Sequence, residues 1–352
     1  MSSTPTTKKT KKPGRPTIKA VAAAAGVSTA AVSQAFNDKG RLAEATRQRI
    51  LDAALDLGWS PSASASALRS ARTRTLALVV RRPTDVLGAD PHFSELITGI
   101  EGELAPRGYG LLLHLVAGVE EEGALYERLA AEKRVDGAVL TDARADDPRP
   151  ALLTRLGLPA VLLGAPTPDA SVPVVGLGNQ GAGVVEVVRH LRGLGHTRIA
   201  YVAGPAELQH TRLRLAVFEE TLTAAGLAPA AVRHTDFSEA AAVAATRELL
   251  AAEDRPTAVV YANDSMAVCG IGTAQRAGLR VPEDLSVVGY DNLPLGGWLH
   301  PRLTTVDQQV QRVGAAAART LLAQCGEDLP ATPLVDRPRL VVRESTGPAP
   351  HL

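Results

Sequence analysis

Three glycines have the spacing that most resembles a chemical motif in this sequence. Gly176, Gly178 and Gly181 follow an apolar run and precede a helical pattern, as in a loop that binds the pyrophosphate of a dinucleotide. That chemistry also requires a carboxylate at the end of the next strand, to hold the ribose. The next apolar run, RIAYVAG, ends without an acid, and the first carboxylate after it is Glu207. Dinucleotide binding is therefore disfavoured, and we expect no cofactor.

No other pattern of residues predicts catalysis. The sequence holds no nucleophile elbow, no phosphate-binding P-loop and no HExxH zinc motif, and its 8 histidines are scattered. The two cysteines, Cys269 and Cys325, lack the spacing of a metal site or a disulfide framework. We expect a binding protein rather than an enzyme, and no metal.

Hydropathy indicates the compartment. No stretch approaches the 18 apolar residues of a membrane span, so no membrane partner is expected. The first residues, MSSTPTTKKTKKPGRPTI, are polar and basic, without the apolar segment of a secretory signal. These features and the low cysteine content predict a cytoplasmic location.

The formal net charge of +1 is a cancellation between two parts of the chain. Residues 1–74 carry 13 Lys and Arg against 4 Asp and Glu, whereas residues 75–352 carry 25 against 33. The first part is therefore +9 and the second −8. This asymmetry predicts a contact with nucleic acid, or with another anionic surface, at one end of the molecule.

Composition divides the chain into four parts. Residues 1–16 are polar and basic and are predicted to be a disordered tail. Residues 17–60 form an Ala-rich helical block. Residues 61–74 have the composition of a linker or hinge, rich in Ser and small residues, with Leu68 as its one large apolar side chain. The body, residues 75–352, has a different hydropathy pattern.

Short apolar runs alternate with amphipathic stretches throughout the body. LALVVR at 76–81 predicts a strand, and SELITGIEGELAPRGY at 94–109 a helix, and similar pairs recur to VVGYD near residue 291. Such alternation is typical of βαβ units and parallel sheet. The length of the body fits two α/β lobes better than one. A cleft between lobes is the usual place for a small ligand.

The basic helical block has the spacing of a helix-turn-helix. Apolar residues recur every three or four positions over TIKAVAAAAG and again over STAAVSQAF, which gives each helix one inward face. Gly26 permits a turn with positive φ, and Ser28 is a good N-cap for the second helix. An ordinary three-helix bundle would also explain the pattern, but the positive charge favours DNA. A third helix over residues 44–59 would cover the other two through Ile50, Leu51, Ala54 and Leu57.

The sequence resembles the lac-repressor family of bacterial transcription regulators over nearly its whole length past the tail. The resemblance is carried by TIKAVAAAAGVSTAAVSQAFN and EATRQRILDAALDLGWSPSASASALRS, then by YANDSMAVCGIGTAQRAGLRVPEDLSVVGYDN, LTTVDQQ and VVREST. It implies a homodimeric repressor of carbohydrate-utilisation genes that binds double-stranded operator DNA. The body would have a periplasmic-binding-protein-like fold that senses a small molecule, which we expect to be a sugar. The implied lobes are about 75–177 with 308–337, and about 178–307 with 338–346.

The resemblance places the second helix of the block in the major groove of DNA. Its first residues, Thr29 and Ala30, would lie near base edges, with Ser33 and Gln34 one turn further on. Gln34 stands where the family commonly has Arg, and Gln prefers adenine whereas Arg pairs with guanine. Candidate phosphate contacts, which set register rather than sequence, are Asn37, Lys39, Arg47 and Arg69.

The linker gains a role from the same resemblance. It would form a hinge helix that orders on operator DNA beside the hinge of the dimer mate, with Leu68 inserted between base pairs from the minor groove. Ser62 stands where the family usually has Asn. In the tail, KKTKKPGRP also resembles an AT-hook, although a basic arm that displaces counterions is the better explanation.

The effector site follows from the body's motifs. Arginine, amide and carboxylate groups around aromatic faces suit a polyol ligand. Phe237 could instead be core, and Asp291 or Arg214 could belong to a structural ion pair. Gly164 stands where sugar-responsive members often have Asp, and Asn179 follows Gly178 where the family commonly has an Asp-Asn pair. These departures leave open a different sugar, or a ligand that is not a sugar. The positions that match family effector contacts are His92, Phe93, Arg214, Phe237, Asn263, Asp291 and Gln308.

The sequence also bears on the oligomeric state and on two alternative functions. Residues near 96–130 would supply much of the dimer interface, and the chain lacks the family's tetramerising heptads after VVREST, which favours a dimer. A transporter's solute-binding protein would need a signal peptide and no basic head. An enzyme on the same fold is the second rival, and activity assays on sugars would reveal it.

Overall fold

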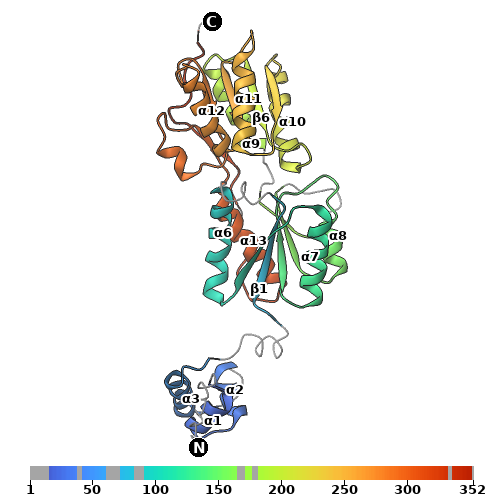
Figure 1. The fold of residues 1–352 in the computed structure, drawn as a ribbon, viewed down its shortest axis with the longest axis vertical. Coiled ribbons are helices and arrows are strands. Elements are labelled where there is room, and N and C mark those ends of the chain that lie inside the picture. Colours follow the sequence, from blue (N-terminus) through green and yellow to red (C-terminus); the bar gives the residue numbers. More distant parts are fainter. Residues whose placement is uncertain are drawn as a thin grey trace, which may run out of the picture. The chain divides into compact units, whose positions relative to one another are not determined.

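The computed structural model describes residues 16–37, 42–60, 72–82, 91–164, 171–176, 181–331 and 335–350. The chain divides into two compact units, Met1–Thr73 and Arg74–Leu352, which we call the head and the body (Figure 1). Within the described ranges, no helix is both long enough and apolar enough to cross a membrane. The candidate wedge Leu68, with Arg69, Ser62, Lys39 and Asn179, lies outside the described residues.

The described part of the head contains three helices: α1 (Ile18–Ala25), α2 (Thr29–Asn37) and α3 (Glu44–Asp56). Gly26 ends α1 with φ 65°, and the Ser28 hydroxyl accepts a hydrogen bond from the Ala31 amide at 3.1 Å, as the sequence predicted. Val21, Val32 and Ile50, one from each helix, are fully buried at the centre of the head.

The third helix is shorter than the sequence predicted. It ends at Asp56, and Leu57, expected to face inward, is 37% exposed. Gly58, with φ 60°, turns the chain so that the Trp59 ring packs edge-on against Phe36 at 5.3 Å between centroids. The aromatic pair therefore closes this end of the core in place of Leu57.

The first lobe of the body is a parallel sheet of five strands in the order β2-β1-β3-β4-β5. Leu76 and Leu78 of β1 point to one face, and Ala77 and Val79 to the other, because side chains alternate along a strand. Helices cover both faces (Figure 1). The elements are β1 (Thr75–Val80), α6 (Pro91–Leu104), η1 (Ala105–Arg107), β2 (Gly110–Leu115), α7 (Val119–Ala131), β3 (Gly137–Leu140), α8 (Arg149–Arg155), β4 (Ala160–Leu163), β5 (Val174–Val175) and α13 (Val310–Gln324).

The second lobe repeats this construction with four parallel strands in the order β7-β6-β8-β9. Ala200 and Val202 face the core with α11 and α12, whereas Ile199 and Tyr201 face the core with α9 and α10. The elements are α9 (Gly181–Gly193), β6 (Ile199–Ala203), α10 (Gln209–Ala224), β7 (Ala231–His234), α11 (Glu239–Ala251), β8 (Ala258–Tyr261), α12 (Asp264–Arg276), β9 (Ser286–Val288), η2 (Pro294–Gly297), and an antiparallel pair β10 (Thr305–Asp307) and β11 (Arg339–Val341).

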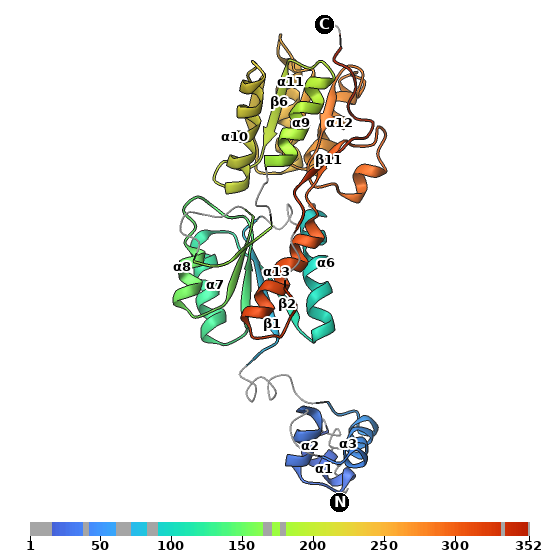
Figure 2. The same cartoon turned by 180° about the vertical axis from the view of Figure 1, so that it is seen from behind.

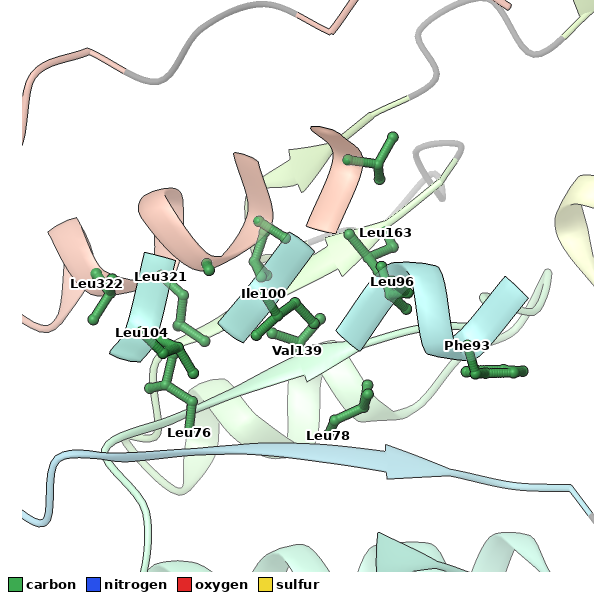
Figure 3. Packing of buried hydrophobic residues seen from close by; sticks show 14 of the residues in the cluster. Leu76, Leu78, Phe93, Leu96, Ile100, Leu104, Val139, Leu163, Leu321 and Leu322 are labelled. Atoms are coloured by element: carbon green, nitrogen blue, oxygen red, sulfur yellow. The ribbon is translucent and has the colours of Figure 1, made fainter. Parts of the chain in front are cut away.

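The chain leaves the second lobe after β10, forms α13 in the first lobe, and returns as β11 (Figure 2). Helix α13 packs against α6 over the first sheet, where Leu321 and Leu322 meet Ile100 and Leu104 (Figure 3). The two helices cross closely at Gly99, where an added Cβ would lie 2.0 Å from the Gln311 carbonyl oxygen. This exchange of segments ties the two lobes together and brings residues 305–310 to the space between them.

Candidate functional site

The exposed face of α2 carries the residues expected to read DNA. Thr29, Ala30 and Gln34 are exposed, and Ser33 is partly buried, so they present a common surface on the head. Asn37 is the last residue of α2, and Arg47 in α3 is partly buried. The guanidinium of Arg49 donates to the Ala25 carbonyl oxygen at 3.0 Å, which fixes α3 against the end of α1. Helix α2 packs into the head through the buried Val32 and Ala35, and its outer face stays exposed.

A pocket between the two lobes gathers most of the expected effector residues. It occupies about 680 Å³, counting space open to solvent. Its wall includes ends of strands and the residues that follow them, from both lobes, as ligand sites of α/β proteins commonly do. Six of the seven expected residues line it: His92, Arg214, Phe237, Asn263, Asp291 and Gln308.

Arg214, Gln308 and Asp291 form one hydrogen-bonded chain in this pocket. Arg214 Nη2 donates to Gln308 Oε1 at 3.1 Å, and Gln308 Nε2 donates to Asp291 Oδ1. The Arg214 guanidinium also lies 3.7 Å above the Tyr290 ring. His92 reaches this chain from the first lobe, with its Nδ1 3.6 Å from Asp291 Oδ1. Arg214 and Asp291 are thus connected through Gln308.

Asn263 is the N-cap of α12 and Asp264 is its first residue, and their side chains make different contacts. Asn263 Oδ1 accepts the Met266 amide at 2.8 Å as the N-cap, so its amide nitrogen is the group that can serve a ligand. Asp264 is buried behind the pocket, where Oδ2 accepts the Leu293 amide at 2.7 Å and Oδ1 accepts the Thr305 hydroxyl. Burial, and next the charge of Asp291, raise the pKa of Asp264 to about 8.

Phe93 does not line the pocket, unlike the other expected residues. It is 2% exposed and belongs to the first-lobe core beside Leu96 (Figure 3). Its ring still supports the site, because the Arg82 guanidinium lies 5.0 Å from its centroid. Phe237 lines the pocket and also packs against the second-lobe core, so both interpretations of this residue hold in part.

The sequence did not predict an ion pair in the wall of the pocket. Arg82 follows β1 and Asp142 follows β3, so neighbouring parallel strands bring them to the same edge of the sheet. Nε and Nη2 of Arg82 donate to Oδ2 and Oδ1 of Asp142 at 2.9 and 3.0 Å. Burial would raise the pKa of Asp142, but the Arg82 guanidinium outweighs it and holds that pKa well below its usual range. The signal for this pair in the sequence was a charged residue directly after each of two predicted strands.

His210 is the third pocket residue that the sequence did not predict. It begins α10, lines the pocket, and stacks on Phe237 with ring centroids 6.2 Å apart. Burial, and next the positive charge of Arg214, lower the pKa of His210 to about 3, so its ring is neutral at pH 7. A neutral imidazole both donates and accepts one hydrogen bond, which suits a hydroxyl ligand.

Apolar side chains and a glycine complete the pocket. Leu96, Leu163, Val310 and Val313 line its first-lobe side. Gly164, at the end of β4 with φ 111°, also lines it, at the position where sugar-responsive members of the resembled family often have Asp. The first-lobe carboxylate that lines the pocket is instead that of Asp142. The groups around the pocket can bind and orient a small ligand.

Together, the head and the body define a class: a bacterial DNA-binding regulator with a periplasmic-binding-protein-like effector domain. Residues 17–62 match the model described as "Bacterial regulatory proteins, lacI family", and residues 188–346 match "Periplasmic binding protein-like domain".

Known proteins match nearly the whole chain. The transcriptional repressor PurR of Photobacterium profundum is 35% identical over 334 residues, 94% of this chain and 98% of PurR. A CelR–cellobiose complex is 35% identical, covers 94% of this chain and 100% of its own, and has a TM-score of 0.70. The lac repressor dimer bound to operator and the anti-inducer ONPF is 27% identical, covers 95% and 100%, and has a TM-score of 0.83. This chain belongs to the lacI family of bacterial regulatory proteins.

Proposed function

We propose that this protein is a cytoplasmic homodimeric repressor of carbohydrate-utilisation genes, and that a sugar in the pocket between the lobes switches its operator affinity. Family membership establishes DNA-binding regulation. The proposal adds to this that the effector is a sugar, that the protein is a dimer, and that the target genes serve carbohydrate utilisation.

The observation that supports a sugar ligand is the mixture of hydrogen-bond donors and acceptors in the pocket. Arg214 and Asn263 supply donors, Asp291 and Asp142 supply acceptors, and His210 supplies one of each. Each sugar hydroxyl both donates and accepts, so it needs such a mixture. The Phe237 ring offers an apolar face to the C–H side of a sugar ring. A wall built for an anion would instead hold an excess of cations.

Two comparisons bear on the same point. The CelR structure is a complex with cellobiose, which supports a sugar ligand for a chain 35% identical to it. PurR is equally similar, so relatedness alone does not select the effector. The mixture of donors and acceptors in the pocket is the observation that supports a sugar.

Binding of the sugar would act on DNA through the lobes. A ligand held by His92 and Asp142 of the first lobe and by Arg214 and Asp291 of the second favours the closed arrangement. In a dimer, closure changes the spacing of the two segments that lead to the heads, and so biases the DNA-competent state. The lac repressor structure, a dimer on its operator, supports this geometry.

On the DNA side, Thr29, Ala30, Ser33 and Gln34 would contact base edges, and Asn37, Arg47 and Arg69 would contact phosphates. Leu68 would insert into the minor groove. Gln34 predicts adenine where an Arg would select guanine, so the half-site should differ at that position.

The test is selection of genomic DNA fragments by the purified protein, followed by thermal-shift measurements with sugars and nucleobases. The proposal expects a near-palindromic site beside genes for sugar uptake, and stabilisation by at least one sugar. Uniform, salt-sensitive binding to all fragments would contradict the specific repressor. Stabilisation by a nucleobase and by no sugar would contradict the effector class while leaving the regulator intact.

A further inference from the structure

Two of the chambers between the lobes share three wall residues. Arg82, Asp142 and Phe237 line both of them and form the divider. The first chamber is the pocket described above. The second chamber lies on the other side of the divider, beside the ends of β1 and β2 and the second-lobe loops that follow β6 and β7. Its wall carries none of Arg214, Asn263, Asp291 and Gln308.

The divider is fixed on one side and movable on the other. Arg82 and Asp142 both belong to the first lobe and are paired in two hydrogen bonds. Phe237 belongs to the second lobe, and the Arg82 guanidinium lies 4.6 Å from its ring centroid. A cation–π contact is weaker than the two-bond ion pair, so a bound ligand can replace it while the lobes stay closed. Its replacement joins the chambers and leaves the ion pair intact.

The second chamber contains buried donors that lack acceptors. Arg144 is 9% exposed, and its Nη2 donates to Glu122 Oε2 at 3.2 Å. Its Nε and Nη1, like Nε of Arg81, are buried without a hydrogen-bond partner among the residues that the structure describes. An unsatisfied buried polar group is costly, and more so when it is charged. These nitrogen atoms are closed to solvent in this arrangement, so a ligand would reach them only if the arginine side chains turned towards the chamber.

Charge argues that this ligand is neutral. With the Arg82–Asp142 pair set aside, the wall has two arginines, Arg81 and Arg144, against three carboxylates. Arg144 is already partly neutralised by Glu122 at 3.2 Å. An anion would meet more negative than positive charge, whereas hydroxyl groups can use both arginine donors and carboxylate acceptors. The carboxylates belong to Glu121, Glu207 and Asp236.

Apolar surface in the second chamber suits the C–H face of a ring. Leu115, Val116 and Ala117 at the end of β2 lie on the first-lobe side, and Leu208 lies on the second-lobe side. The lobes also touch here, because the Gln209 amide donates to the Ala143 carbonyl oxygen at 2.8 Å. A ligand in this chamber would therefore add to the contacts that hold the lobes closed.

We propose that the effector is a neutral polyhydroxylated ligand of at least two rings that spans the divider. One ring lies in the first chamber against Arg214 and Asp291, and the other lies in the second chamber against Arg144 and Glu207. This inference rests on the proposed function, since it specifies the size of the sugar that the same cleft senses.

The experiment is calorimetric titration of the full chain with the disaccharides cellobiose, maltose, lactose and trehalose, and with the monosaccharides glucose and galactose. Three variants separate the chambers. Ala117→Phe fills the second chamber from an exposed position, Glu207→Gln removes one of its carboxylates, and Asp291→Asn alters the first chamber. Ala252→Phe, an equal enlargement at an exposed position at the end of α11, is the matched control.

We expect one disaccharide to bind at least about tenfold more tightly than its component monosaccharides, which corresponds to about 1.4 kcal/mol. Ala117→Phe and Glu207→Gln should each remove most of that difference and leave monosaccharide binding unchanged. Asp291→Asn should weaken both kinds of sugar, and Ala252→Phe neither.

Two results would overturn the inference. If a monosaccharide binds as tightly as its disaccharides, or if Ala117→Phe leaves disaccharide affinity unchanged, the second chamber holds no part of the ligand, while sugar sensing itself stands. If none of the sugars binds, the sugar effector of the proposed function fails together with this inference.

Discussion

Replacing Arg82 with methionine tests the organisation of the effector cleft. The Arg82–Asp142 pair has two hydrogen bonds of 2.9 and 3.0 Å, and its side chains are only 11% and 12% exposed. Removing one partner of a buried pair costs about 3–5 kcal/mol, because the other charge stays buried and unpaired. Loss of the contacts with the Phe93 and Phe237 rings adds to this. We expect Arg82→Met to lower the free energy of unfolding of the body by about 3–5 kcal/mol.

The chain offers a matched control for this substitution. Arg280 and Asp284 form the same two-bond pair, at 2.9 Å each, but with side chains 70% and 26% exposed. Arg280→Met should have no measurable effect, because water replaces the lost partner. Urea unfolding followed by far-ultraviolet circular dichroism at pH 7 measures both variants. Equal effects of the two substitutions would refute the argument from burial.

The pH dependence gives the Arg82→Met prediction a second signature. In the wild type the pKa of Asp142 is depressed by Arg82, so this stabilisation is present above the unfolded pKa and is lost as pH falls. In the variant, burial is the largest remaining influence on Asp142 and raises its pKa, opposed only by the weaker effects of His210 and His92. The difference between variant and wild type should therefore be smaller at pH 4 than at pH 7.

Three further predictions concern other parts of the molecule. Gly99→Ala places a Cβ against the Gln311 carbonyl oxygen and should lower the free energy of unfolding by about 1–3 kcal/mol, as measured by thermal unfolding. An unchanged unfolding midpoint would show that α6 and α13 can separate freely. The pKa of His210 is lowered to about 3 from 6.5, so its contribution to stability falls by about 1.4 kcal/mol per pH unit below pH 6.5, and His210→Gln should abolish that slope. Gln34→Arg should shift selected half-sites from adenine to guanine at one position, and an unchanged site would exclude Gln34 from base reading.

Local patterns predicted much of the fold. The inward faces of α1 and α2 followed from three- and four-residue spacing, and Gly26 and Ser28 marked the turn. The alternating runs of the body became two parallel sheets because each run is short, apolar and followed by a helix. The end of α3 could not be predicted, since whether Leu57 or Trp59 closes the core depends on the tertiary contact with Phe36.

The site was predicted only in part, for a physical reason. Arg214, Asn263 and Asp291 could be carried over because they lie in motifs that the family shares. Arg82 and Asp142 are 60 residues apart, and their pairing depends on β1 and β3 being neighbours in the sheet. The Gln308 relay likewise requires β10 to end beside Arg214 and Asp291, which no local pattern encodes.

Operator affinity with and without effector tests the central claim most directly. A DNA fragment obtained by selection is titrated by fluorescence anisotropy with the wild type and with Asp291→Asn, each in the absence and presence of the sugar found by calorimetry. We predict that the sugar changes wild-type operator affinity by at least about fivefold, a typical size for coupling between sites. The variant should bind operator as the wild type does without sugar and should not respond to it. Wild-type affinity that is indifferent to a bound sugar would contradict the account.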